Sequence, residues 1–172
     1  MKTLSFFIVL TIAMSLGILN ANAQKAHTHG SATMDISIEK NKIEVNVNIP
    51  GMDLVGFEGK AKTKQHKENL KTVTDLLTKD YSLFIIPEGA GCNVTKRKLE
   101  SEHDDKDHGG KGHSGYEYEV EYKCKDISKI TELDVNLFRD IQSLTEITVQ
   151  VVTEKEQKSA KLTSTETVLK LK

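Results

Sequence analysis

Alternating apolar residues near the start of the chain constrain its fold more than any other feature. Over residues 32–49, Met34, Ile36 and Ile38 alternate with polar residues. After a polar turn the alternation resumes with Ile43, Val45, Val47 and Ile49. Because successive side chains of a strand point to opposite faces, the pattern predicts a β-hairpin with one apolar face. Such a hairpin favours an antiparallel sheet that covers a core on one side.

A helix is predicted over residues 63–79, with Thr63 as its N-cap. Its apolar side chains recur at spacings of three and four and share one face; they are Leu70, Val73, Leu76 and Leu77. This is the principal helix expected in the chain.

Strand patterns return in the second half of the chain. Residues 116–124 alternate strictly between apolar or aromatic and charged side chains, and residues 92–99 alternate less clearly. A short helical turn near 138–144, a strand at 145–152 and one or two strands after residue 157 complete the pattern. The sequence therefore predicts one α+β domain that consists mainly of antiparallel β-sheet.

The first 23 residues have the composition of a cleavable export signal. Lys2 supplies a positive charge, an apolar stretch covers residues 4–19, and Ala21-Asn22-Ala23 is an A-x-A cleavage sequence. The apolar stretch is too short and too interrupted for a membrane anchor. We therefore expect residues 24–172 to form an exported single domain that is not embedded in a membrane.

Net charge gives no reason to expect a polyanionic partner. The chain has 24 basic and 25 acidic residues, and its formal net charge is −1. Its lysines are spread along the sequence, which is typical of a solvated surface. Neither nucleic acid nor anionic lipid is therefore an expected partner.

Cys92 and Cys124 are the only cysteines in the chain. In an oxidising compartment two cysteines usually form a disulfide, which is our prediction for this pair. Two thiolate metal ligands are the alternative, and the absence of a C-x-x-C spacing disfavours it. If the flanking strands pair, the bond ties the base of a hairpin.

Five of the six histidines lie in two short patches. The first is His27-Thr28-His29-Gly30, directly after the expected cleavage site. In an extended chain, side chains two residues apart lie on the same side, so His27 and His29 can approach one ion. If the first strand extends back to residue 27, both histidine side chains lie on its polar face. A frayed, solvated terminus is the alternative.

The second patch lies in residues 101–115, which contain four glycines and hardly any apolar side chain. We expect this segment to be a mobile loop, because it cannot bury enough surface to become ordered. Imidazole and carboxylate groups together are typical ligands of Zn²⁺, whereas a merely hydrophilic loop would rarely combine them with glycine. The predicted metal ligands are His27, His29, His103, Asp104, Asp107, His108 and His113.

Three other functions compete with zinc binding: copper or nickel handling, catalysis, and an exported interaction domain with an incidental histidine-rich loop. Cleavage after Gln24 would place His27 third from the free amine, an arrangement suited to Cu(II) or Ni(II), although the A-x-A sequence favours cleavage after Ala23. Catalysis is not expected, because no G-x-S-x-G, H-E-x-x-H or cysteine-nucleophile pattern is present. A catalytic zinc also needs a rigid frame of ligands, whereas most candidates here lie on the loop.

Taken in their order along the chain, these features resemble the ZrgA family of periplasmic zinc-binding proteins. The likeness rests on residues 26–30, 54–58, 90–92, the histidine loop, Cys124, 133–138 and 157–162. It implies a soluble periplasmic protein that binds zinc, assists its uptake and passes ions to membrane transport components. Two departures stand out: the loop has only three histidines, and Gly59 stands where relatives often have histidine.

Overall fold

The computed structural model describes residues 28–103 and 114–171. The predicted export signal lies outside these ranges. The same is true of His27, Asp104, Asp107, His108 and His113 among the predicted ligands.

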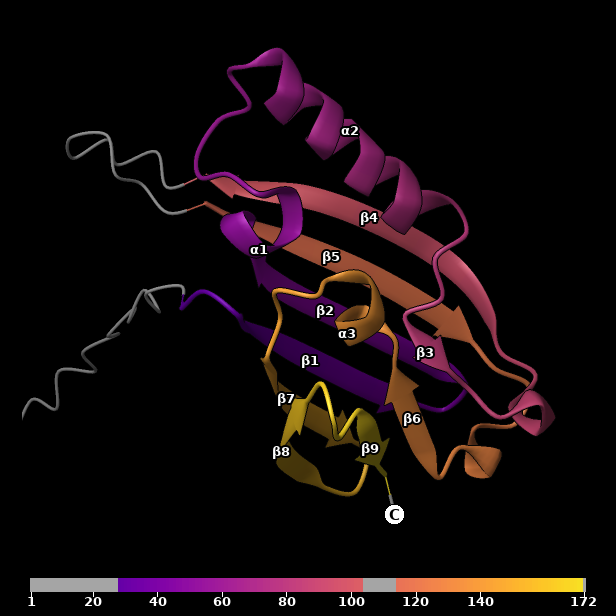
Figure 1. Cartoon of the computed structure of the whole chain (residues 1–172). Helices are drawn as coiled ribbons and strands as arrows, with labels where there is room; N and C mark the ends of the chain where they lie inside the picture. Colours follow the sequence, from indigo (N-terminus) through magenta and orange to yellow (C-terminus); the bar gives the residue numbers. More distant parts are fainter. Residues whose placement is uncertain (1–27, 104–113, 172) are drawn as a thin grey trace, which may run out of the picture.

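A six-stranded sheet forms one layer of the fold, in the order β4-β5-β2-β1-β7-β8 (Figure 1). The predicted hairpin is confirmed, because β1 and β2 pair antiparallel. Every other neighbouring pair in this sheet is also antiparallel except β1 and β7, which run parallel. The strands are β1 (Ser31–Glu39), β2 (Lys42–Pro50), β4 (Asn93–His103), β5 (Ser114–Lys123), β7 (Glu146–Thr153) and β8 (Gln157–Thr163).

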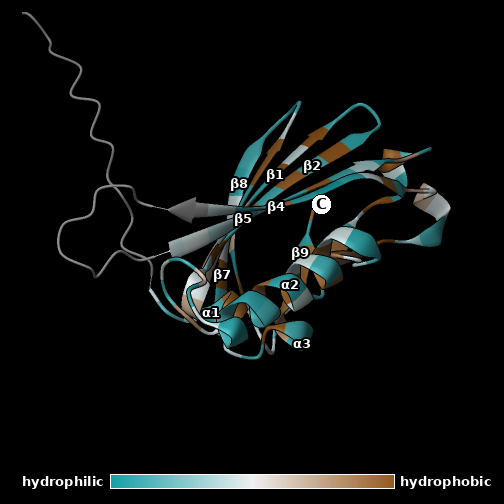
Figure 2. Ribbon diagram, turned by 90° about the horizontal axis from the view of Figure 1, so that it is seen from above, coloured by the Kyte–Doolittle hydropathy of each residue, from teal (hydrophilic) through white to brown (hydrophobic). Residues whose placement is uncertain are grey.

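The helices and a small second sheet lie on one side of the large sheet (Figure 2). The helices are α1 (Gly51–Val55), α2 (Lys64–Lys79) and α3 (Leu137–Asp140), with 3₁₀ turns η1 (Glu88–Ala90) and η2 (Ile127–Lys129). The second sheet has the order β3-β6-β9 and consists of β3 (Phe84–Ile85), β6 (Glu132–Val135) and β9 (Val168–Lys170). The fold is therefore α+β, as predicted.

The core lies between these two layers. The alternating apolar residues of β1 and β2 face it, and Met34, Ile43 and Val47 are completely buried. On the same face, the hydroxyl of Tyr118 donates a hydrogen bond of 2.8 Å to the carbonyl oxygen of Leu77 in α2. Burial raises the pKa of this tyrosine above its ordinary value. The period-two pattern thus produces the one-sided burial that the sequence predicts.

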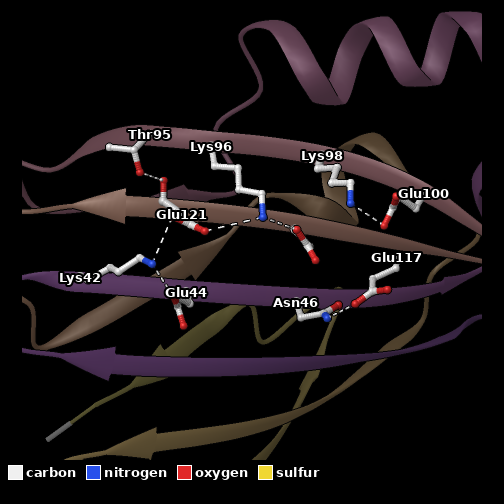
Figure 3. A network of polar contacts seen from close by, with 10 residues as sticks. Lys42, Glu44, Asn46, Thr95, Lys96, Lys98, Glu100, Glu117 and Glu121 are labelled. Atoms are coloured by element: carbon white, nitrogen blue, oxygen red, sulfur yellow. Dashed lines mark hydrogen bonds and ion pairs between the residues drawn. The ribbon is translucent and has the colours of Figure 1, made fainter.

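The opposite face of the large sheet is covered by charged side chains that pair across strands (Figure 3). Lys96 of β4 contacts Glu119 at 2.6 Å and Glu121 at 3.7 Å. Lys42 of β2 contacts Glu121 at 3.2 Å. Pairs this exposed contribute little to stability, so this face is a solvated surface of nearly balanced charge.

The principal helix begins and ends close to the predicted bounds. The Thr63 hydroxyl accepts a hydrogen bond of 3.0 Å from the backbone N–H of His66, which confirms the predicted N-cap. Leu77 is buried, whereas Leu76 is 50% exposed, so the prediction that Leu76 belongs to the buried face is wrong. Successive residues of a helix lie about 100° apart, and Leu77 takes the inward position. Within the described ranges, no helix is both long and apolar enough to cross a bilayer.

The hairpin of β4 and β5 corrects the bounds of the predicted loop. The two strands pair from Asn93 and Lys123 to His103 and Ser114, so 101–103 and 114–115 are strand residues. Ser114 and Gly115 are buried, and α1 packs against the start of β5. This packing holds the strands together beyond the point where their apolar pattern ends. The Cys92–Cys124 disulfide joins the other end of the hairpin, as predicted.

Candidate functional site

One end of the large sheet gathers residues that lie far apart in the sequence. Because β1, β2, β5 and β4 pair antiparallel in that order, β1 and β5 begin at the end where β2 and β4 finish (Figure 1). At the same end, β2 continues into α1, and Glu58 lies in the segment that joins α1 to α2. We call this region the hairpin end.

His29 lies in a tight turn directly before β1, and its side chain is 54% exposed. Gly30 has a φ of +79°, which bends the chain away from the strand direction. The expectation that His29 continues the polar face of the first strand is therefore wrong, although the side chain is accessible as expected. The Gly30 N–H donates to Asp53 Oδ2 at 2.7 Å, and its carbonyl accepts from the Thr145 N–H at 2.8 Å. These bonds fix the turn against α1 and the start of β7.

The Glu58 carboxylate has one oxygen that accepts hydrogen bonds and one that lies near this turn. Its Oε2 accepts hydrogen bonds from the backbone N–H of Ser114 at 2.7 Å and from the Ser114 hydroxyl at 3.1 Å. Its Oε1 lies 4.0 Å from His29 Nδ1, too far for a hydrogen bond. Among the residues that the structure describes, Oε1 is buried and has no hydrogen-bond partner. The carboxylate is thus held in place with one oxygen left over for another ligand.

The spacing of these two atoms suits a shared metal ion. Zinc binds nitrogen and oxygen ligands at about 2.0–2.2 Å, so two ligands of a tetrahedral ion lie roughly 3.3 Å apart. A small rotation of the exposed His29 side chain would shorten 4.0 Å to that separation. From the sequence, Glu58 is a possible extra ligand, but an ordinary surface acid is the preferred interpretation, and Glu58 is not among the predicted ligands.

Ser114 connects the start of β5 to the segment after α1 by hydrogen bonds. The residue is 1% exposed, and its hydroxyl also accepts a hydrogen bond of 3.0 Å from the Gly59 N–H. Gly51, at the start of α1, approaches it so closely that an added Cβ would lie 2.3 Å from the Ser114 hydroxyl oxygen. Ser114 therefore positions both Glu58 and the segment that carries it.

The second histidine patch leaves the sheet beside this residue. His103 is the last residue of β4 and lies opposite Ser114 in the strand register. Residues paired in this way have Cα atoms about 4.5–5.5 Å apart. Both ends of residues 104–113 are therefore attached next to the anchor of Glu58. Two predicted ligand positions, the turn of His29 and the last residue of β4, His103, therefore lie at the same end of the sheet, on strands three positions apart.

The remaining histidine supports the segment that carries Glu58. The ring of His66 stacks on that of Phe57, with 4.1 Å between ring centroids and an interplanar angle of 1°. Asn69 of α2 also donates a hydrogen bond of 3.1 Å to the Val55 carbonyl oxygen. These contacts fix α2 against α1 and hold the intervening segment in place.

A complete metal shell is not formed by the described part of the chain alone. Within residues 28–103 and 114–171, no group of three or more His, Cys, Asp or Glu side chains converges. His29 and Glu58 would fill two positions of a four-coordinate ion, so further ligands must come from elsewhere. The disulfide excludes both cysteine sulfurs as thiolate ligands.

Comparison with known protein families identifies the family to which the chain belongs. The family model described as "ZrgA family zinc uptake protein" matches residues 26–171. No curated protein sequence is similar enough to count as a match. The chain belongs to the ZrgA family, which places it in zinc uptake.

Proposed function

We propose that the protein is exported to the periplasm, captures Zn²⁺ at the hairpin end and passes it to a membrane transport system. The observation that carries this proposal is the unpartnered Oε1 of Glu58, which faces His29 beside the attachment points of residues 104–113. Membership in a zinc uptake family supports the choice of metal. The protein would act as a binding protein and not as an enzyme.

The proposed shell combines two kinds of ligand. Glu58 is already ordered by Ser114, so using it costs little conformational entropy. His27, His103, Asp104, Asp107, His108 and His113 would complete the shell around it and His29. If residues 101–115 carry ligands on the mobile loop that the sequence predicts, these ligands must be ordered when they bind, so the affinity should be moderate and the ion readily exchanged.

Capture and release would then require only the exchange of metal ligands, with no reaction catalysed by the metal. Zinc is exchanged when one ligand at a time is replaced by a ligand of the acceptor. Protons compete with zinc for imidazole nitrogens, so the affinity should fall as the pH is lowered through the titration of histidine.

Replacing Glu58 with glutamine tests the proposal at the residue on which it depends. Glu58→Gln removes the charged oxygen and keeps a side chain of the same size, so zinc affinity should fall about tenfold or more. Isothermal titration calorimetry of the untagged protein measures the change. Glu88→Gln, an exposed acid in η1, is the control and should bind zinc as the wild type does. Equal affinities for all three proteins would remove Glu58 from the ligand set.

A further inference from the structure

Lysines gather along one ridge of the fold next to the hairpin end. Residues 60–79 contain six lysines and two acids, although the whole chain has a net charge of −1. All six are exposed, and they lie on α2 and on the segment before it. We call this set the basic ridge; it consists of Lys60, Lys62, Lys64, Lys67, Lys71 and Lys79.

The two acids offset part of the charge of the other three lysines, Lys64, Lys71 and Lys79. Asp75 contacts Lys71 at 2.5 Å and Lys79 at 3.3 Å, and these lysines hold the pKa of the Asp75 carboxyl below its usual value. Glu68 contacts Lys64 at 3.7 Å.

The part of the ridge nearest the candidate site keeps its positive charge. Over the described ranges, the structure records no carboxylate within 4.0 Å of Lys60, Lys62 or Lys67. Lys60 follows Glu58 by two residues, which is at most about 7 Å of chain. The contacts of Asn69 with Val55 and of His66 with Phe57 hold α2 beside this segment.

Positive charge at this place does not help to hold a cation. Charges within a Debye length of about 8–10 Å act on a bound ion, and lysines there weaken its binding. The same lysines favour an encounter with a protein that accepts the ion. Carboxylates are among the ligands of Zn²⁺, and an acceptor that presents them is attracted and oriented by a basic donor surface.

We propose that Lys60, Lys62 and Lys67 dock the acidic surface of a zinc-accepting protein and so bring its ligands to the ion at the hairpin end. This inference rests on the proposed function and adds the chemistry of the partner. A lipid surface fits less well, because α2 exposes only one large apolar side chain, Leu76. A helix that lies in a membrane interface needs a broad apolar face.

Zinc transfer from the loaded, untagged protein to synthetic peptide chelators tests the inference. One peptide carries glutamates around its zinc ligands, and a second carries glutamines there. The variant is the triple change Lys60→Gln, Lys62→Gln and Lys67→Gln. The matched control is Lys123→Gln, Lys129→Gln and Lys155→Gln, which removes the same charge from exposed lysines near the opposite end of the sheet.

The transfer rate should rise with the concentration of the acidic peptide and fall as salt is added. In the ridge variant the rate to this peptide should drop about tenfold at low ionic strength, with under a twofold change in the control. Transfer to the glutamine peptide should be slow and alike in all three proteins. The zinc affinity of each protein is measured in parallel, so failure to bind zinc would reject the proposed function and not merely the docking surface.

Three results would overturn the docking inference while zinc binding stands. One is a transfer rate that does not depend on acceptor concentration, because the ion would then leave before any encounter. Another is an equal loss of rate in the ridge variant and the control. The third is binding of the wild type, but not the ridge variant, to vesicles containing phosphatidylglycerol, which would assign the lysines to a lipid surface.

Discussion

Replacing Cys92 and Cys124 with alanine should lower the free energy of unfolding by roughly 3–4 kcal/mol. The disulfide closes a loop whose ends are 32 residues apart, and such a cross-link removes this much entropy from the unfolded chain. It also ties the start of β4 to the end of β5, where the hairpin has no other covalent restraint. Urea denaturation of the oxidised wild type and the double variant measures the difference. Thiol-reduced wild type is the control and should behave as the variant does.

The same variant separates stability from zinc binding. The disulfide and Ser114 lie at opposite ends of β5, whose ten residues span about 33 Å. At a temperature where the variant is folded, its zinc affinity should therefore be close to that of the wild type. An unfolding free energy unchanged by the substitution would contradict the structural role of the bond. A lost affinity in the folded variant would place the cysteines in the site.

Gly51→Ala should destabilise the protein by about 3 kcal/mol and weaken zinc binding as well. The added Cβ would lie 2.3 Å from the Ser114 hydroxyl oxygen, 2.9 Å from its carbonyl oxygen and 3.1 Å from the Phe57 carbonyl oxygen. Two of these atoms belong to the backbone, so the overpacked site has to shift as a whole. Because Ser114 anchors Glu58, the shift should also move the carboxylate away from His29.

Two further variants make this result specific. Gly89→Ala is the matched control, because no atom lies within 4 Å of an added Cβ there, and its stability should change by less than about 1 kcal/mol. Combining Gly51→Ala with Ser114→Ala removes the shortest contact but leaves the backbone contacts. The loss in the double variant should therefore be smaller than the sum of the two single losses. Strict additivity would show that Gly51 and Ser114 do not compete for the same space.

Local patterns in the sequence were enough to predict most elements of this fold. The alternation over 32–49, the helix capped by Thr63 and the strand over 116–124 all appear where expected, because each pattern lies within one element. The parallel pairing of β1 with β7 was not predicted. These strands are more than a hundred residues apart, and alternation indicates which face of a strand is buried but not which strand lies beside it.

The candidate site was less predictable because it depends on contacts between distant segments. Imidazoles in two patches indicated metal binding, and the paired strands bring His103 to the end of the sheet at which β1 begins. The sequence alone favoured an ordinary surface acid at Glu58 over an extra ligand, and the ligand interpretation gained support when the start of β5 was found against the segment after α1. Ser114 gave no signal, since one serine in a polar, glycine-rich stretch looks like any other loop residue. The copper or nickel alternative depends on His27, which lies outside the described residues.

Calorimetric titration of the untagged protein, cleaved after Ala23, with Zn²⁺ at neutral pH tests the central claim most directly. We expect at least one ion to bind with measurable heat, and we expect weaker binding when His103, His108 and His113 are replaced together. Absence of any binding to the folded, oxidised protein would contradict zinc capture at the hairpin end. Binding that is unchanged in both stoichiometry and affinity by the triple replacement would contradict the part assigned to the second histidine patch.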